Sequence, residues 1–89
     1  MSKIYLIYST FSSEQEALLV ARALVEKRLA ACANVHAGIT SVYHWENKLE
    51  EAPEVALTAK TTADKLKNAM DEVKRLHSYE VPCIIACPI

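Results

Sequence analysis

The stretch that decides the fold covers residues 29–45 and reads LAACANVHAGITSVYHW. Its first, small residues end a helix and pass directly into a strand in which side chains alternate between two faces. Gly38, the only glycine of the chain, allows a bend or bulge in this strand. The next residues, 46–48, form a tight turn in which Asn47 is the best candidate for a positive φ. The sequence therefore predicts a long β-hairpin at the centre of the chain.

Upstream of the hairpin, the pattern predicts one strand and one helix. Residues 4–8 (IYLIY) are continuously apolar, β-branched and aromatic, as in a buried central strand. Ser13 and Glu16 have the spacing of a capping box, in which the serine hydroxyl takes one orphan N–H and the glutamate reaches back to another. Apolar residues then recur at three- and four-residue steps, which predicts a helix that runs to about Leu29.

Downstream of the turn, we expect a return strand over about residues 54–60, a second helix and a last strand. Thr61 or Thr62 is expected to cap the helix, with Asp64 in its first turn. The last strand covers residues 79–89 and contains two prolines, which favours an edge position. The order β-α-β-β-α-β predicts an α+β, ferredoxin-like sandwich, in which an antiparallel sheet carries two helices on one face.

Composition limits the size and the partners of the protein. The 89 residues form a single domain, residues 1–89, and their 52% hydrophobic content exceeds what so small a core can cover, which favours an oligomer. A net charge of −1 without a basic stripe argues against nucleic acid as a partner. We expect no membrane span, since no apolar run reaches 18 residues. Three cysteines without Cys-x-x-Cys spacing indicate free thiols and a cytoplasmic location.

Four segments, in this order, resemble the CutA family of divalent-cation tolerance proteins: residues 29–45, Glu54, residues 60–62 (KTT) and residues 77–82 (HSYEVP). The resemblance implies a ferredoxin-like subunit of the PII-like superfamily, in which long hairpins from three subunits pair edge to edge into a homotrimer. It also implies a role in tolerance of divalent metal ions, copper in particular. Family members continue with a glycine-containing turn and a short final helix, so we expect this chain to lack the family's C-terminal segment.

The resemblance also indicates where a metal ion would bind. In some members the proposed copper ligands are a cysteine near the end of the first strand and two consecutive histidines, which correspond here to Ser9, Leu76 and His77. His77 alone keeps a ligand side chain, so it is the candidate metal ligand, for copper or another divalent ion. A soft-metal site of His77 and Cys83 is a further option. The alternative for His77 is a cap at a helix C-terminus or a hydrogen-bonded residue of the interface.

Three residues of the predicted hairpin are candidates for packing or for an interface cleft. Alternation places Tyr43 and Trp45 on one face of the strand, where they form either a ligand platform or intersubunit packing. Cys32, at the start of the strand, is expected to be a small buried hydrophobic residue.

Glu54 and Lys60 share one face of the return strand and lie about 20 Å apart. Each is expected to pair with another subunit. Alternatively, Lys60 faces the intersubunit cleft beside His77 and Tyr79, where it attracts a small anion.

The sequence contains no nucleophile–base pair, no glycine-rich phosphate loop and no carboxylate dyad, so we expect no enzyme. The predicted function is that of a trimeric binding or structural protein in the response to divalent metal ions. The alternatives are a PII-like sensor of small molecules and a trimeric anchoring protein that acts through its intersubunit clefts.

Overall fold

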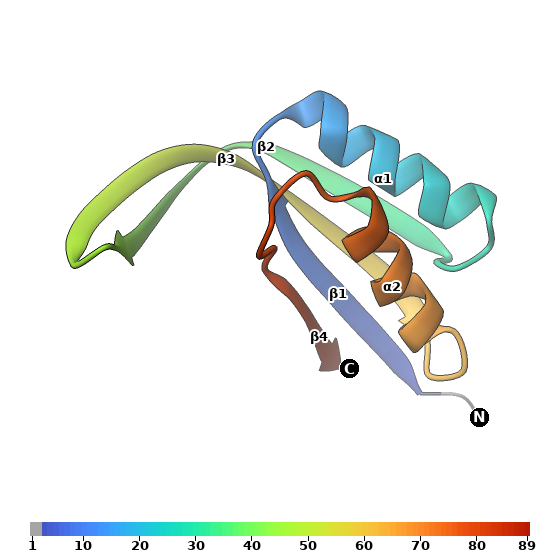
Figure 1. Ribbon diagram of the computed structural model, residues 1–89. Helices are drawn as coiled ribbons and strands as arrows, with labels where there is room; N and C mark the ends of the chain where they lie inside the picture. The colour runs from blue at the N-terminus through green and yellow to red at the C-terminus, as the bar shows by residue number, and fades with distance from the viewer. Residues whose placement is uncertain (1–2) are drawn as a thin grey trace.

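The predicted order of strands and helices is confirmed in the computed structural model, which describes residues 3–89 (Figure 1). The elements are β1 (Ile4–Phe11), α1 (Glu14–Glu26), β2 (Cys32–Trp45), β3 (Lys48–Thr62), α2 (Leu66–Leu76) and β4 (Ile84–Pro88). All neighbouring strands are antiparallel, in the order β2-β3-β1-β4. This is the ferredoxin-like arrangement, with β4 at an edge as predicted. The strand β4 is shorter than the predicted range 79–89 and contains only Pro88, because Pro82 lies in the loop before it.

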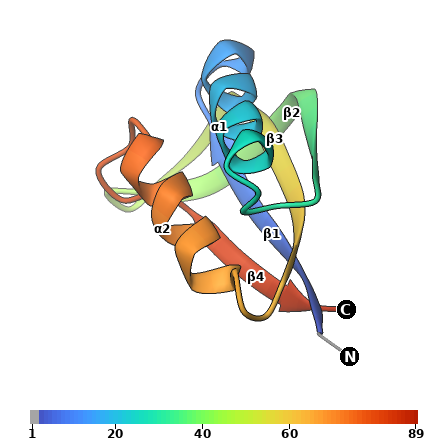
Figure 2. The ribbon, with the colours of Figure 1, turned by 90° about the vertical axis from the view of Figure 1, so that its right-hand side faces the viewer.

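Both helices lie on the same face of the sheet, and the core lies between them (Figure 2). Ile7 and Phe11 of β1 and Leu57 of β3 are completely buried there. The helices contribute Val20 and Leu24 of α1 and Ala69 and Val73 of α2, all of them also fully buried. Alternation along each strand therefore directs one set of side chains into this core and the next set away from it.

No helix in the described part of the chain covers the opposite face of the sheet, which we call the open face. The register places Cys32, Lys60, Leu6 and Cys87 in one row across all four strands on this face. Cys32, Lys60 and Cys87 are exposed, and Ile85 of the adjoining row is 55% exposed. The sheet thus presents a broad surface of mixed polarity that this chain leaves open to solvent.

The start of α1 confirms only half of the predicted capping box. The Ser13 hydroxyl accepts the Glu16 N–H at 3.1 Å, as expected for an N-cap serine. The Glu16 carboxylate does not return to Ser13; it accepts hydrogen bonds from the backbone N–H (3.2 Å) and the hydroxyl (3.0 Å) of Ser78. Glu16, predicted to cap its own helix, therefore bonds to a loop residue 62 positions away.

The helix α1 ends at Glu26, about one turn before the predicted end near Leu29. The Leu29 N–H donates to the Leu24 carbonyl and the Arg28 N–H to the Val25 carbonyl, which is the hydrogen-bond pattern of a Schellman motif. Arg28 adopts a φ of 58°, the left-handed conformation that this motif requires. The motif turns Leu29 back onto the core, so its apolar side chain continues the helical pattern without being helical.

The β2–β3 hairpin extends beyond the helices as a curved arm (Figure 1). The bulge predicted at Gly38 is confirmed by a register shift between His36 and Ile39 and by a φ of 79° at the glycine. Glu46 (φ 52°) and Asn47 (φ 64°) form the two-residue turn, where two positive φ angles match the twist of a hairpin. The return strand begins at Lys48 rather than near residue 54, because it pairs with β2 along the whole arm.

The expected cap of α2 is wrong. The helix begins at Leu66, and neither Thr61 nor Thr62 caps it. The Thr61 hydroxyl donates instead to the Leu29 carbonyl at 2.6 Å, and Asp64 lies before the first residue of the helix. Both threonines still belong to β3, whose pairing with β1 continues to residue 62. The tertiary contact of Thr61 therefore takes precedence over the local cap.

An ion-pair network joins the end of α1 to α2. The Glu72 carboxylate accepts hydrogen bonds from Arg75 (2.8 and 2.9 Å) and from Lys27 (2.5 Å), and only 9% of its side chain is exposed. The hydrogen bonds from Arg75 and then Lys27 lower the pKa of Glu72 from its usual 4.5 to about 2. Glu72 thus remains charged in the folded protein under conditions that protonate it in the unfolded chain.

This difference predicts a pH-dependent contribution to stability. Because the folded pKa lies below the unfolded one, the contribution is complete above about pH 4.5 and is lost as the pH falls through about 2. We expect Glu72→Gln to lower the free energy of unfolding at pH 7, and the difference from the parent to shrink between about pH 4.5 and 2. Urea unfolding followed by circular dichroism across this range measures it.

The matched control is Asp71→Asn, since Asp71 forms only an exposed pair with Lys67 on the same helix. A difference between parent and Glu72→Gln that stays constant over the whole range would contradict the assignment.

Candidate functional site

His77, the predicted metal ligand, is buried at the C-terminal end of α2, with a side chain that is 0% exposed. Its ring stacks on Phe11, with centroids 4.3 Å apart and planes 14° apart. Nε2 lies 2.7 Å from the Thr10 carbonyl, and Nδ1 lies 3.1 Å from the Tyr79 backbone N–H. A carbonyl only accepts and an N–H only donates, so the ring is the neutral tautomer that carries its proton on Nε2.

The ring therefore has no free lone pair with which to bind a metal ion. Nε2 is protonated, and the lone pair of Nδ1 accepts the Tyr79 N–H. Within residues 3–89, no three His, Cys, Asp or Glu side chains come together in an arrangement that could hold a metal ion. His77 as placed does not fit a metal ligand, and its role as one stays a prediction.

Ser9, which stands where some family members have a cysteine proposed as a copper ligand, also has a structural role. Its side chain is completely buried, and its hydroxyl donates to the Cys83 carbonyl at 2.7 Å. This bond fastens the segment before β4 to β1. Cys83 itself is exposed, so the optional pairing of its thiol with the buried His77 ring finds no support in the arrangement.

Tyr79 and Glu54 meet next to His77. The Tyr79 hydroxyl donates to the Glu54 carboxylate at 2.6 Å, and the Tyr79 and His77 rings lie 4.7 Å apart. Burial of the phenol, followed by its hydrogen bond to Glu54, raises the pKa of Tyr79 well above its usual value near 10. The phenol is therefore a hydrogen-bond donor at every physiological pH, and it holds the arm of the sheet against the loop after α2.

We call the group formed by Glu16, His77, Ser78, Tyr79 and Glu54 the loop cluster. It joins the first turn of α1, the end of β1, the loop after α2 and the base of the hairpin arm. The contact between Glu16 and Ser78 could not be predicted from the sequence, because it spans 62 positions and no local pattern marks it. Within this chain Glu54 bonds to Tyr79, and its expected pairing with another subunit stays a prediction.

Lys60 does not lie beside His77 and Tyr79. It pairs with Leu6, whereas His77 contacts Thr10, which lies about 13 Å farther along the same strand. Lys60 and His77 of one subunit are therefore far apart, and the expected position of Lys60 in an intersubunit cleft stays a prediction. Lys60 lies at the other end of the sheet, directly opposite Cys32.

Cys32 is exposed in the described chain, contrary to the expectation of a buried residue. It lies on the open face, which has no covering element, so alternation directs its side chain to solvent. Tyr43 and Trp45 share a face of the arm, as expected, together with Glu54. They are 43% and 64% exposed, so their packing role depends on a partner outside this chain.

The fold and the loop cluster define a ferredoxin-like protein in which His77, Tyr79 and Glu54 hold the loop after α2 against the sheet. Comparison with known proteins gives the family. The chain matches the model of the CutA1 divalent ion tolerance protein over residues 5–89. The chain belongs to the CutA family of divalent-cation tolerance proteins.

Relatives and solved structures agree with this assignment. The divalent-cation tolerance protein CutA of Archaeoglobus fulgidus is 48% identical over 83 residues, which cover 93% of this chain and 80% of the relative. The CutA1 structure from Ehrlichia chaffeensis matches with a TM-score of 0.94 and 36% identity, covering 100% of this chain and 83% of that one. The structure of the Archaeoglobus protein, described as periplasmic, matches with a TM-score of 0.90 and 46% identity, covering 97% and 83%.

The loop cluster yields a stability prediction. Tyr79→Phe removes the hydrogen bond to the partly buried Glu54 carboxylate, so we expect a loss of about 1–2 kcal/mol in the free energy of unfolding. Guanidinium unfolding measures this loss. Tyr43→Phe is the control, because its exposed hydroxyl lies on the same face and makes no such bond to Glu54. Equal losses in the two variants would show that the Tyr79 bond is not the cause.

Proposed function

We propose that this protein acts as a homotrimer in the tolerance of divalent metal ions such as copper. It does so as a binding or structural protein of the cytoplasm and not as an enzyme. Membership of the divalent-cation tolerance family supports the metal-related role. Three free, exposed thiols support a reducing compartment. No helix among residues 3–89 is long and apolar enough to cross a membrane.

The observation that carries the trimer proposal is the apolar surface of the hairpin arm. Val42, Tyr43, Trp45 and Leu49 are all between 43% and 65% exposed on this arm. Large apolar side chains that gather on a projecting element mark an interaction surface rather than a stable free surface. The arm also extends beyond the two helices, so neither helix covers its tip (Figure 1).

The free edge of β2 adds a second argument. β2 pairs with β3 on one side only, and it stands at the end of the strand order. A long, unpaired edge exposes backbone N–H and C=O groups that a strand from another chain can satisfy. A copy of the same chain offers such a strand together with matching apolar residues. Three copies arranged around one axis would cover the open faces and pair the arms.

The oligomer is tested with an arm variant. By light scattering at micromolar concentration, we expect the parent to have three times the 9.9 kDa mass of one chain. Trp45→Glu places a charge in the proposed interface and should shift the mass toward that of one chain. Leu19→Glu is the control, since Leu19 is 53% exposed on α1, away from the arm. A monomeric parent, or equal effects of both variants, would refute the proposal.

The role of His77 in metal binding is tested separately. Because both ring nitrogens are occupied, we expect copper and zinc to bind the chelator-stripped parent and His77→Gln with affinities within about twofold. Calorimetric titration measures both, and circular dichroism confirms that the variant folds. His77→Gln retains an N–H that can donate to Thr10, which protects the fold better than His77→Ala. A tenfold weaker affinity of the variant for either metal would contradict this expectation and show that His77 is a metal ligand.

A further inference from the structure

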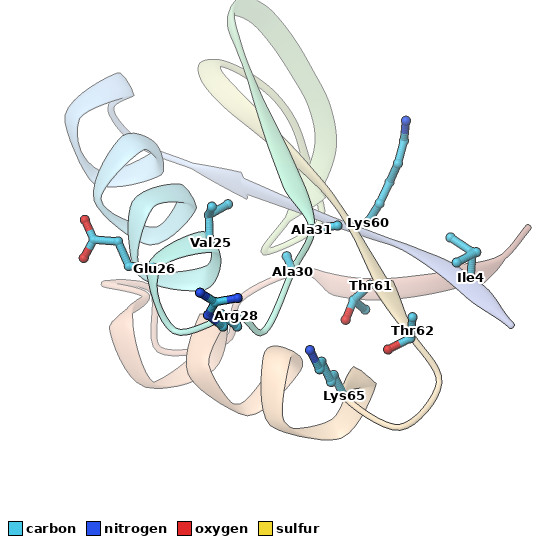
Figure 3. Close-up of a pocket in the computed structure, with 10 residues that line it drawn as sticks. All are labelled: Ile4, Val25, Glu26, Arg28, Ala30, Ala31, Lys60, Thr61, Thr62 and Lys65. Carbon is cyan, nitrogen blue, oxygen red and sulfur yellow. The ribbon is translucent and has the colours of Figure 1, made fainter. Parts of the chain in front are cut away.

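A cavity of about 470 Å³ lies at the end of the sheet opposite the loop cluster (Figure 3). It is formed where the chain leaves α1 and enters β2, beside the end of β3 and the residue before α2. Its volume lies in the range of small-molecule sites, about 300–1,000 Å³. Three cationic residues line it, Arg28, Lys60 and Lys65, together with one acidic residue, Glu26.

Two of the cations border the same space. In Figure 3 the charged ends of Arg28 and Lys65 lie on either side of the region below Ala30, whereas Lys60 and Glu26 point away. In the described part of the chain, neither Arg28 nor Lys65 has a carboxylate oxygen within 4.0 Å. Like charges that border one cavity without a counter-ion repel each other, and a bound anion would remove this repulsion.

Asp64 comes directly before Lys65 in the chain. A hydrogen bond from Thr62, and to a lesser degree the charge of Lys65, lower the pKa of Asp64, so it is ionised at neutral pH. No ion pair joins Asp64 to Lys65 within residues 3–89. The positive charges of Arg28 and Lys65 are therefore not offset by an ion pair among these residues.

Arg28 has a backbone conformation that glycine adopts more readily than arginine does. Its φ of 58° is the left-handed conformation at the end of a Schellman motif, where glycine is the usual residue because a Cβ is disfavoured. An arginine here costs stability, and its exposed side chain makes no hydrogen bond or ion pair with residues 3–89 that would offset this cost. The conformation does place the guanidinium over the cavity.

We propose that this cavity binds the phosphate group of a small phosphorylated molecule, held between Arg28 and Lys65. The planar guanidinium can donate two parallel hydrogen bonds to phosphate oxygens, and the ammonium adds a mobile point charge. The bound group would join the end of α1 to the start of α2. Since only the folded chain presents both cations together, binding raises the melting temperature. This site depends neither on metal binding nor on the trimer.

Pyrophosphate is the probe, titrated into the full chain at constant ionic strength. Backbone amide NMR shifts and calorimetry report the binding site and the affinity. We expect saturable shifts at residues 28–31 and 60–65 and a rise in melting temperature. Lys65→Ala should weaken binding at least tenfold. Inorganic phosphate and citrate are run in parallel, so that a phosphate group shared by many ligands is distinguished from a general preference for polyanions.

Arg28→Gly is the decisive variant, because loss of binding cannot be attributed to unfolding. Glycine relieves the left-handed backbone, so the unliganded variant should melt at or above the temperature of the parent. It should nevertheless bind pyrophosphate at least tenfold more weakly.

Lys67→Ala is the matched control. It removes the same charge from an exposed residue that pairs with Asp71 and lies outside the cavity lining. Binding within twofold of the parent supports the proposal. Equal weakening by Lys67→Ala, citrate binding as tight as pyrophosphate, or no shifts at the named amides would each overturn it.

Discussion

The two helices cover only one face of a four-stranded sheet, and this constraint governs the rest of the structure. A chain of 89 residues has enough apolar surface for one core, and Phe11, Leu24 and Leu57 are completely buried in it. Other large apolar side chains remain exposed: Val42, Tyr43, Trp45 and Leu49 on the arm, Ile85 on the open face, and Leu19 and Val25 on α1. The arm, which extends beyond the helices, carries the largest group of them. In the proposed trimer, this surface would be buried against a second copy of the chain.

His77 illustrates how the fold uses a reactive side chain. The imidazole supplies one donor and one acceptor in a fixed plane, which is what the Thr10 carbonyl and the Tyr79 N–H require. A buried backbone group without a partner would cost about 1–3 kcal/mol, so the histidine stabilises the junction by satisfying two of them. Phe11 holds the ring in its plane by stacking. The same properties make histidine a good metal ligand, which is why sequence alone cannot separate the two roles.

The elements that sequence predicts well are those fixed by neighbours in the chain. The bulge at Gly38 and the turn at Asn47 follow from local backbone preferences, and both are confirmed. The errors occur where a distant residue competes with a local one. Thr61, expected to cap α2, bonds instead to the Leu29 carbonyl, and Glu16, expected to complete a capping box, bonds instead to Ser78. The candidate site could not be predicted for the same reason. Its hydrogen bonds join segments that are distant in the sequence, so no periodicity or spacing reveals them.

The left-handed residues of the chain bound or interrupt β2, and most of them are not glycine. Arg28 precedes this strand, Gly38 bends it, and Glu46 and Asn47 end it. A side chain in this conformation costs free energy in the folded state, but it also narrows the range of φ and ψ that the backbone can explore. The turn at the tip of the arm is therefore formed by two residues with restricted backbones, whereas Gly38 forms the bulge at its base. A tip whose conformation is already fixed would lose less conformational entropy on association with another subunit. At Arg28, the same left-handed conformation places a cation beside the cavity.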